Sequence, residues 1–344
     1  MNHNKNILGY LYFIIHFIAE ITSFYILTLY TNNDLIWILA LLYDFIAFVP
    51  QGLLGYLRDK GLKINFATIG LLLTTLSLLL FNFNINEILV ILILSIGNCM
   101  IHIQGAETTL RSSKGKISPS AIFVSGGSFG VITGKVLATY NIPIYLIIII
   151  NLLMIIPIII CNKYSHLIND KNLDKYNFSN KKINSKTIIT LAVFVVIVRS
   201  FMGYGIPTTW NKTLIQAVYL YCAMGLGKAI GGLLIDSIGI KKTALISTIG
   251  ALPFLLLGNN IMTISLIGIM MFSMTMAITL GIIVSELKKY PGVAFGLTTL
   301  GLFLGALPIF FFRINTVLTS YIIITSLTII STIILIKICR KEKL

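Results

Sequence analysis

Charged residues are scarce in this 344-residue sequence. Asp, Glu, Lys and Arg make up 11% of it, whereas a typical soluble domain contains about 25%. Hydrophobic residues reach 57%, and the mean hydropathy is +0.95. This composition excludes a water-soluble fold, a nucleic-acid-binding protein and a secreted disulfide scaffold. The four cysteines are scattered without a CxxC pair, so we expect no structural disulfides, no metal site and no cofactor.

Long apolar stretches occupy nearly the whole chain. A membrane-spanning helix needs about 20 mostly apolar residues, and the sequence predicts twelve. The class is therefore an all-α membrane protein. The predicted spans are 7–30, 34–57, 64–82, 86–105, 118–140, 143–161, 187–206, 213–235, 242–257, 260–284, 291–312 and 316–337.

The longest polar stretch divides these spans into two equal groups. It runs from Asn162 to Lys186, between spans six and seven. We therefore expect an N-terminal six-helix half (1–161), a central loop (162–186) and a C-terminal six-helix half (187–344).

Basic residues fall almost entirely on one side of this topology. Of 26 Lys and Arg residues, 21 lie on the side of the N-terminus, two lie on the opposite side and three lie within spans. Basic loops stay in the cytoplasm, so both termini are expected there, in a multi-pass protein of the plasma membrane. The net charge of +15 thus reflects topology rather than a polyanionic partner.

A loop motif occurs once in each half. Gly55, Asp59 and Gly61 follow span two, and Gly232, Asp236 and Gly239 follow span eight, each set ending in Lys. The first copy is one residue shorter than the second. A carboxylate at such a position can pair with a cation or with a neighbouring helix N-terminus. We expect both loops to form cytoplasmic latches, and Asp236 to matter more than Asp59.

Together with the twelve spans, this motif resembles the loop G-x-L-x-D-x-x-G-x-[RK]-[RK] of the major facilitator superfamily. The resemblance covers the whole chain and implies two pseudo-symmetric six-helix bundles that transport a small molecule by alternating access. A narrower stretch, 101–107 followed by 123–134, is similar to fosmidomycin-resistance-type exporters of this superfamily. That similarity implies export.

Small residues repeat along spans five and eleven. Gly126, Gly130 and Gly134 recur every fourth residue, and Gly301 and Gly305 repeat the spacing. Such spacing lets membrane helices pack closely. The resemblance implies a second interpretation, because in the family these helices line the interface between the halves. The glycines are then equally compatible with a surface along which the two halves slide. Residues 126–130 also match the hydrolase pattern G-x-S-x-G, but mid-helix rather than on a strand-to-helix elbow. With no other catalytic motif, we expect no enzyme.

Ionisable groups inside spans are costly and therefore functional candidates. Glu20 and Asp44 lie in the N-terminal half, and we expect them to carry protons, because a carboxylate in a dry cavity has a raised pKa. The expected substrate-cavity residues are His16, Gln51, Lys135, Arg199, Tyr221 and Lys228. His102 and Glu107 are expected near the cytoplasmic end of span four, as either a hydrated contact or a gate.

Three functions are compatible with this pattern. The leading one is a proton-coupled exporter of a small polar or ionic molecule, such as a drug or metabolite. The second is an importer or facilitator of a small anion, held by the basic residues. The third, a non-transporting receptor or membrane enzyme, lacks a catalytic motif or extramembrane domain. The expected partners are the substrate, protons and the lipid bilayer, and we expect a monomer.

Overall fold

The computed structural model describes residues 3–165, 170–205, 210–258, 260–311 and 317–340, and within these ranges the chain is helical without a β-strand. The first part contains α1 (His3–Leu29), α2 (Ile36–Phe48), α3 (Gln51–Asp59), α4 (Phe66–Asn82), α5 (Glu87–Ser112), α6 (Ser118–Thr139), α7 (Ile144–Ser165) and η1 (Asp170–Lys175). The second contains α8 (Ser185–Gly205), α9 (Leu214–Ile238), α10 (Ile240–Leu245), η2 (Ile246–Gly250), α11 (Leu252–Leu257), α12 (Met262–Ser273), α13 (Thr275–Glu286), α14 (Pro291–Ala306), η3 (Leu307–Phe310) and α15 (Val317–Ile338).

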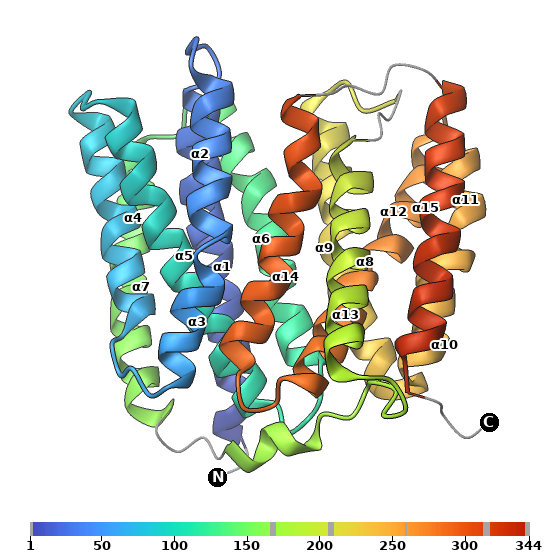
Figure 1. Ribbon diagram of the computed structural model, residues 1–344. Coiled ribbons are helices and arrows are strands. Elements are labelled where there is room, and N and C mark those ends of the chain that lie inside the picture. The colour runs from blue at the N-terminus through green and yellow to red at the C-terminus, as the bar shows by residue number, and fades with distance from the viewer. Residues whose placement is uncertain (1–2, 166–169, 206–209, 259, 312–316, 341–344) are drawn as a thin grey trace.

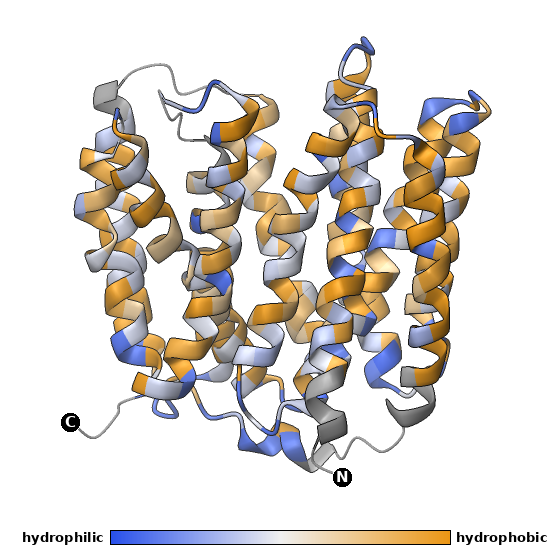
Figure 2. Ribbon diagram, turned by 180° about the vertical axis from the view of Figure 1, so that it is seen from behind, coloured by the Kyte–Doolittle hydropathy of each residue, from blue (hydrophilic) through white to orange (hydrophobic). Residues whose placement is uncertain are grey.

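Helices long enough to cross a membrane dominate the described residues. Ten continuous or nearly continuous helical stretches there are long and apolar enough, and two shorter apolar helices are Phe66–Asn82 and Ile144–Ile160. Each of these helices overlaps one predicted span, although α5 runs on to Ser112 where the predicted span ends at residue 105. Hydrophobic residues predominate along these helices (Figure 2). On α7, for example, Leu153 and Ile156 are 63% and 64% exposed, as expected of side chains that face lipid.

Three predicted spans are interrupted rather than continuous. Span two consists of α2 and α3, which meet at Pro50, where the chain lacks a backbone N–H donor. Span nine combines α10, the π-helical η2 and α11. Pro253 lies near the start of α11, and its ring disfavours a regular turn against the carbonyl four residues earlier. Span ten breaks between α12 and α13 at Met274.

The ends of the described chain lie at one face of the molecule, at the bottom of Figure 1. Helices α1 to α5 and α7 lie on one side, whereas α10, α11, α12 and α15 lie on the other, with α6, α9 and α14 between them (Figure 1). Near the face that holds the termini, hereafter the terminal face, α14 lies against α3. Further away an apolar groove lies between α14 and α2, and Phe45 and Phe303 meet across it edge to face, with ring centroids 5.7 Å apart.

The central polar segment docks on the terminal face. The Tyr176 side chain is fully buried, and its hydroxyl donates to the backbone oxygen of Leu110 at 3.1 Å; burial also raises the pKa of this hydroxyl. The backbone N–H of Phe178 then donates to Ser285 Oγ at 2.9 Å, and that of Asn180 to the carbonyl of Ile338. The segment therefore joins α5 to α13 and α15.

Candidate functional site

A cavity of about 120 Å³ lies where helices from both parts of the chain meet. Its wall comes from α1, α2, α5 and α6 on one side and from α8, α9, α13 and α14 on the other. It has room for several water molecules or a small polar solute. Of the expected residues, the cavity is lined by His16, Glu20, Asp44, Arg199, Tyr221 and Lys228.

An acid–imidazole cluster forms the wall on the side of α1 and α5. His16 and Glu20 are one turn apart on α1, with His16 Nε2 3.8 Å from Glu20 Oε1. His102 reaches them from α5, where its Nε2 lies 2.6 Å from His16 Nε2 and 3.3 Å from Glu20 Oε1. All three side chains are at least 94% buried. The expectation that His102 lies near the cytoplasmic end of its span is wrong, because α5 continues to Ser112.

Glu20 also belongs to a buried amide network. Asn98 Nδ2 donates to Glu20 Oε1 at 3.1 Å, and the same amide contacts Ser23 Oγ at 3.1 Å and Tyr43 Oη at 2.9 Å. Asn98 is fully buried in an otherwise apolar turn of α5. Asn98 is not among the residues predicted from the sequence, although it lies four residues from His102 and therefore shares a helix face with it.

Asp44 and Gln51 take different positions. Asp44 is half-buried and lines the cavity. Gln51, expected to line the cavity, is not among the lining residues. It is fully buried behind His102, where its Nε2 donates to the carbonyl of Ala47 at 2.7 Å and lies 3.4 Å from His102 Nδ1. Gln51 therefore orients a cavity residue instead of facing the cavity.

The basic side of the cavity comes from α8 and α9. Lys228 Nζ donates to Ser128 Oγ on α6 at 2.7 Å. Arg199 is 8% exposed, and its Nη2 lies 3.6 Å from Met276 Sδ. Acidic groups of the first part thus face basic groups of the second across one cavity, as the sequence pattern predicts.

Lys135 lies beside the cavity in an aromatic setting. Its Nζ is 5.6 Å from the ring centroid of Phe24 and 5.2 Å from that of Tyr221, within cation–π range. The Tyr221 hydroxyl is 3.5 Å away. Lys135 therefore connects α6 with α9 next to the cavity.

Both aspartates of the repeated loop bind the N-terminus of a helix from the other part of the chain. Asp59 accepts from the backbone N–H groups of Gly292 and Val293 at 3.1 and 3.0 Å, at the start of α14. Asp236 accepts from those of Ile117 and Ser118, both at 3.0 Å, at the start of α6. A carboxylate is favourable there, because the first N–H groups of a helix lack partners within it.

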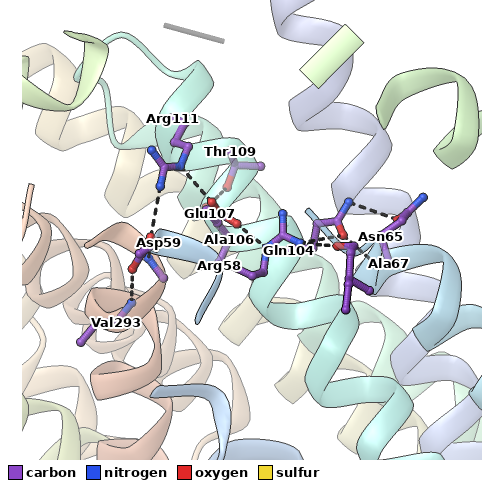
Figure 3. Close-up of polar contacts among 12 residues, drawn as sticks. Arg58, Asp59, Asn65, Ala67, Gln104, Ala106, Glu107, Thr109, Arg111 and Val293 are labelled. Atoms are coloured by element: carbon purple, nitrogen blue, oxygen red, sulfur yellow. Dashed lines mark hydrogen bonds and ion pairs between the residues drawn. The ribbon is translucent and has the colours of Figure 1, made fainter. Parts of the chain in front are cut away.

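Asp59 has an additional ionic partner (Figure 3). Arg111 Nη2 lies 3.2 Å from Asp59 Oδ1, and Arg111 Nε donates to Glu107 Oε1 at 2.9 Å. Glu107 in turn forms an ion pair with Arg58. This chain of charges links α3 and α5 to the start of α14 at the terminal face.

Glycines permit close helix contact beside each aspartate. A Cβ on Gly55 would collide with the backbone of Gly292, and one on Gly232 with Ala121 and Ser118. Gly61 and Gly239 have φ of 100° and 90°, a backbone conformation that other residues rarely adopt. The two copies of the motif are therefore alike in contact as well as in sequence.

The glycines of spans five and eleven pack against the first helix of their own part. Cβ atoms on Gly126, Gly130 and Gly134 would meet the carbonyls of successive turns of α1. On α14, a Cβ on Gly305 would likewise meet the carbonyl of Ile197 on α8, whereas one on Gly301 would meet the Val196 side chain. These contacts agree with the packing interpretation and lie within each part, rather than on a surface between the parts.

Comparisons with known proteins identify the fold. No family model matches the sequence, and no curated protein matches it. The structure is similar to the human organic anion transporter MFSD10 (TETRAN), with a TM-score of 0.69, 12% identity and coverage of 97% of this chain and 99% of that one. It is also similar to the E. coli fucose:proton symporter FucP, with a TM-score of 0.63, 14% identity and coverage of 95% and 96%.

A second FucP structure, in the outward conformation, matches with a TM-score of 0.63, 14% identity and coverage of 96% and 98%. The chain therefore has the fold of major facilitator superfamily transporters, as its sequence predicts, and is a multi-pass membrane protein. These structural neighbours are transporters and not enzymes. The resemblance to fosmidomycin-resistance-type exporters stays a prediction.

Proposed function

We propose that this chain is a secondary transporter that moves a small polar or ionic molecule by alternating access. One observation carries the proposal. A cavity with acidic and basic walls lies between helices of both parts of the chain, and repeated contacts join those parts at the terminal face. The opposed charges can bind a polar or ionic substrate. The contacts at the terminal face can break when the protein opens on that side during the transport cycle.

The proposed architecture has twelve spans in two six-helix halves, 1–161 and 187–344, joined by the loop 162–186. Ten long apolar helices support this number, with the shorter apolar helices α4 and α7 counted as the two remaining spans. The basic loops favour a cytoplasmic terminal face in the plasma membrane. In this orientation, the latch contacts close the protein towards the cytoplasm. The groove between α2 and α14 then lies on the outer side of the membrane.

Proton coupling is proposed for the acidic wall. Glu20 and Asp44 both border the cavity, and a carboxylate that alternates between wet and dry surroundings can bind and release a proton. Arg199 keeps its charge at every physiological pH, so it can stabilise a facing carboxylate but cannot carry the proton. The function that we propose first is proton-coupled export of a metabolite or drug-like molecule.

Import or facilitated passage of a small anion is the second candidate. It is favoured by Arg199 and Lys228, which both border the cavity and can bind carboxylate or phosphate groups. Exchange experiments with the protein in liposomes separate the two. A panel of labelled small molecules, half of them anions, is measured with and without an imposed pH gradient.

Uphill movement that needs the gradient supports proton coupling, whereas gradient-independent passage of anions alone supports the second candidate. Passage of no compound under either condition contradicts both.

A further inference from the structure

Three side chains of metal-binding type converge on one edge of the cavity. They are His16, Glu20 and His102, and their nearest donor atoms all lie within 4.8 Å of one another. Nothing in the sequence pattern predicts this group, because His102 comes from α5 and the other two from α1. We propose that these residues bind a divalent transition-metal ion of the Zn²⁺ type.

The spacing of the donor atoms fits such an ion. The edges of the triangle formed by His16 Nε2, His102 Nε2 and Glu20 Oε1 are 2.6, 3.3 and 3.8 Å. The point equidistant from these corners lies about 1.9 Å from each, close to the roughly 2.0–2.2 Å of Zn–N and Zn–O bonds. Small side-chain rotations therefore bring all three atoms to coordination distance.

The His16 ring is already oriented for coordination. Its Nδ1 lies 2.8 Å from the carbonyl oxygen of Phe123, so Nδ1 carries the proton and Nε2 offers its lone pair. A hydrogen bond of this kind typically orients metal-binding histidines. Gly127 provides the space, because a Cβ there would approach His16 Nε2 to 2.6 Å.

Gln51 can orient His102 in the same manner. Its Oε1 is buried and has no hydrogen-bond partner among the described residues, while its Nε2 lies 3.4 Å from His102 Nδ1. If His102 binds the ion through Nε2, its ring proton lies on Nδ1, and Gln51 Oε1 can accept it once the side chain turns away from the Ala47 carbonyl, to which Nε2 now donates at 2.7 Å. His102 Nε2 is then free to coordinate, and the orphaned oxygen gains a donor.

Nearby charges act on this site in both directions. The Glu20 carboxylate and the neighbouring Asp44 favour a cation, whereas Lys228 and Arg199 on the opposite wall disfavour one. The three ligands leave a fourth position for water or a ligand atom, and all three residues line the cavity. An open position of this kind is typical of reactive rather than purely structural zinc sites.

The test is direct binding to the purified full-length protein in detergent, prepared without a polyhistidine tag and stripped with EDTA. Zn²⁺ is titrated against a chromogenic chelator, and Co²⁺ is added in a parallel sample to record its visible spectrum. We expect one equivalent of Zn²⁺ and the intense visible bands of four-coordinate Co²⁺.

The variants His16→Gln, His102→Gln and Glu20→Gln should each weaken Zn²⁺ binding by more than about tenfold, since loss of an outer-shell partner alone typically costs 10–100-fold. Gln51→Leu keeps all three ligands and should fall within that range. Lys228→Met removes an opposing charge and should tighten binding. The control is His3→Gln combined with His166→Gln, which replaces the other two histidines of the chain and should leave the affinity unchanged.

The proposal is overturned if the stripped protein binds no Zn²⁺, or if the affinity is unchanged when His16 and His102 are replaced. Gel filtration verifies that each variant is folded, and the wild-type Co²⁺ spectrum tests the coordination without any variant. Binding at equilibrium does not require transport, so failure here leaves the transporter proposal standing, and the reverse also holds.

Discussion

The carboxylate of Asp59 accepts a hydrogen bond of 3.1 Å from the backbone N–H of Gly292, 233 residues further along the chain. Asp236 makes the equivalent contact with the start of α6. Two copies of one sequence motif thus fasten the two parts of the chain to each other, each through the helix N-terminus of the other part. A carboxylate–helix contact is strong enough to favour one state and weak enough to be broken in a transport cycle.

Neutralising either aspartate is expected to weaken the closed terminal face. Asp236→Asn removes the charge at the helix N-terminus and should shift the equilibrium by about 0.5–1 kcal/mol. Asp59→Asn also loses the Arg111 ion pair and should shift it by about 1–2 kcal/mol. With this additional ion pair we predict the opposite of the order expected from the shortened first loop. The measurement is transport in liposomes, with membrane insertion verified for each variant; unchanged transport in the double variant would reduce both loops to topology signals.

Gly52 and Gly55 lie one turn apart on α3. Replacing each with alanine distinguishes the effect of helix–helix contact from that of helix propensity. A Cβ on Gly55 would collide with the Gly292 backbone, whereas a Cβ on Gly52 would meet nothing within 4 Å. Gly55→Ala should therefore hold α3 and α14 apart and slow transport, while Gly52→Ala should not.

The readout is the rate at which a cysteine at Met276, in the cavity wall, reacts with an impermeant thiol reagent added at the terminal face. Gly55→Ala should raise that rate. Equal rates in the two alanine variants would show that the close contact does not close this face.

Much of this arrangement could be predicted from the sequence because it depends on local spacing. The pairing of His16 with Glu20 follows from their four-residue separation, and the latch loops follow from the repeat. Their partners could not be predicted: the N–H groups of Ile117 and Gly292 bind the aspartates only because helices distant in sequence pack together. Apolar periodicity identifies a helix but not its neighbour.

The depth of His102 could not be predicted for a different reason. A span counted by hydrophobicity ends at residue 105, where polar residues begin, but α5 continues to Ser112. Seven residues correspond to about 10 Å along a helix. The helix continues because the buried Gln104 and Glu107 have partners: the Gln104 side chain accepts from the N–H of Ala67, and Glu107 binds Arg58 and Arg111.

The orientation of the chain can be tested by cysteine labelling. Lys182 is exposed in the central segment, on the terminal face. Asn82 is exposed at the end of α4 that points away from this face. In intact cells, Asn82→Cys should react with an impermeant thiol reagent, and Lys182→Cys should react only after the membrane is opened. Labelling of Lys182→Cys from outside would place the terminal face outside the cell and invert the proposed direction of the latches.

The acidic wall provides the sharpest test of coupling. In the parent protein, the Asn98 amide donates to a Glu20 oxygen at 3.1 Å. Glu20→Gln keeps the side-chain shape and an oxygen that can accept this hydrogen bond, but removes the titratable group. It should abolish accumulation driven by a pH gradient while sparing downhill exchange of the same substrate. Asp44→Asn should reduce accumulation in the same assay, because Asp44 borders the same cavity.

Ser23→Ala is the matched control. It removes a hydrogen bond from the same buried network, between Ser23 and Asn98, without changing any titratable group. Such a bond contributes about 0.5–1.5 kcal/mol, so this variant should be slightly less stable yet still accumulate substrate against a gradient. If Glu20→Gln and Asp44→Asn also accumulate substrate like the parent, the two carboxylates are structural, and passage of an anion held by Arg199 and Lys228 becomes the better account of the cavity.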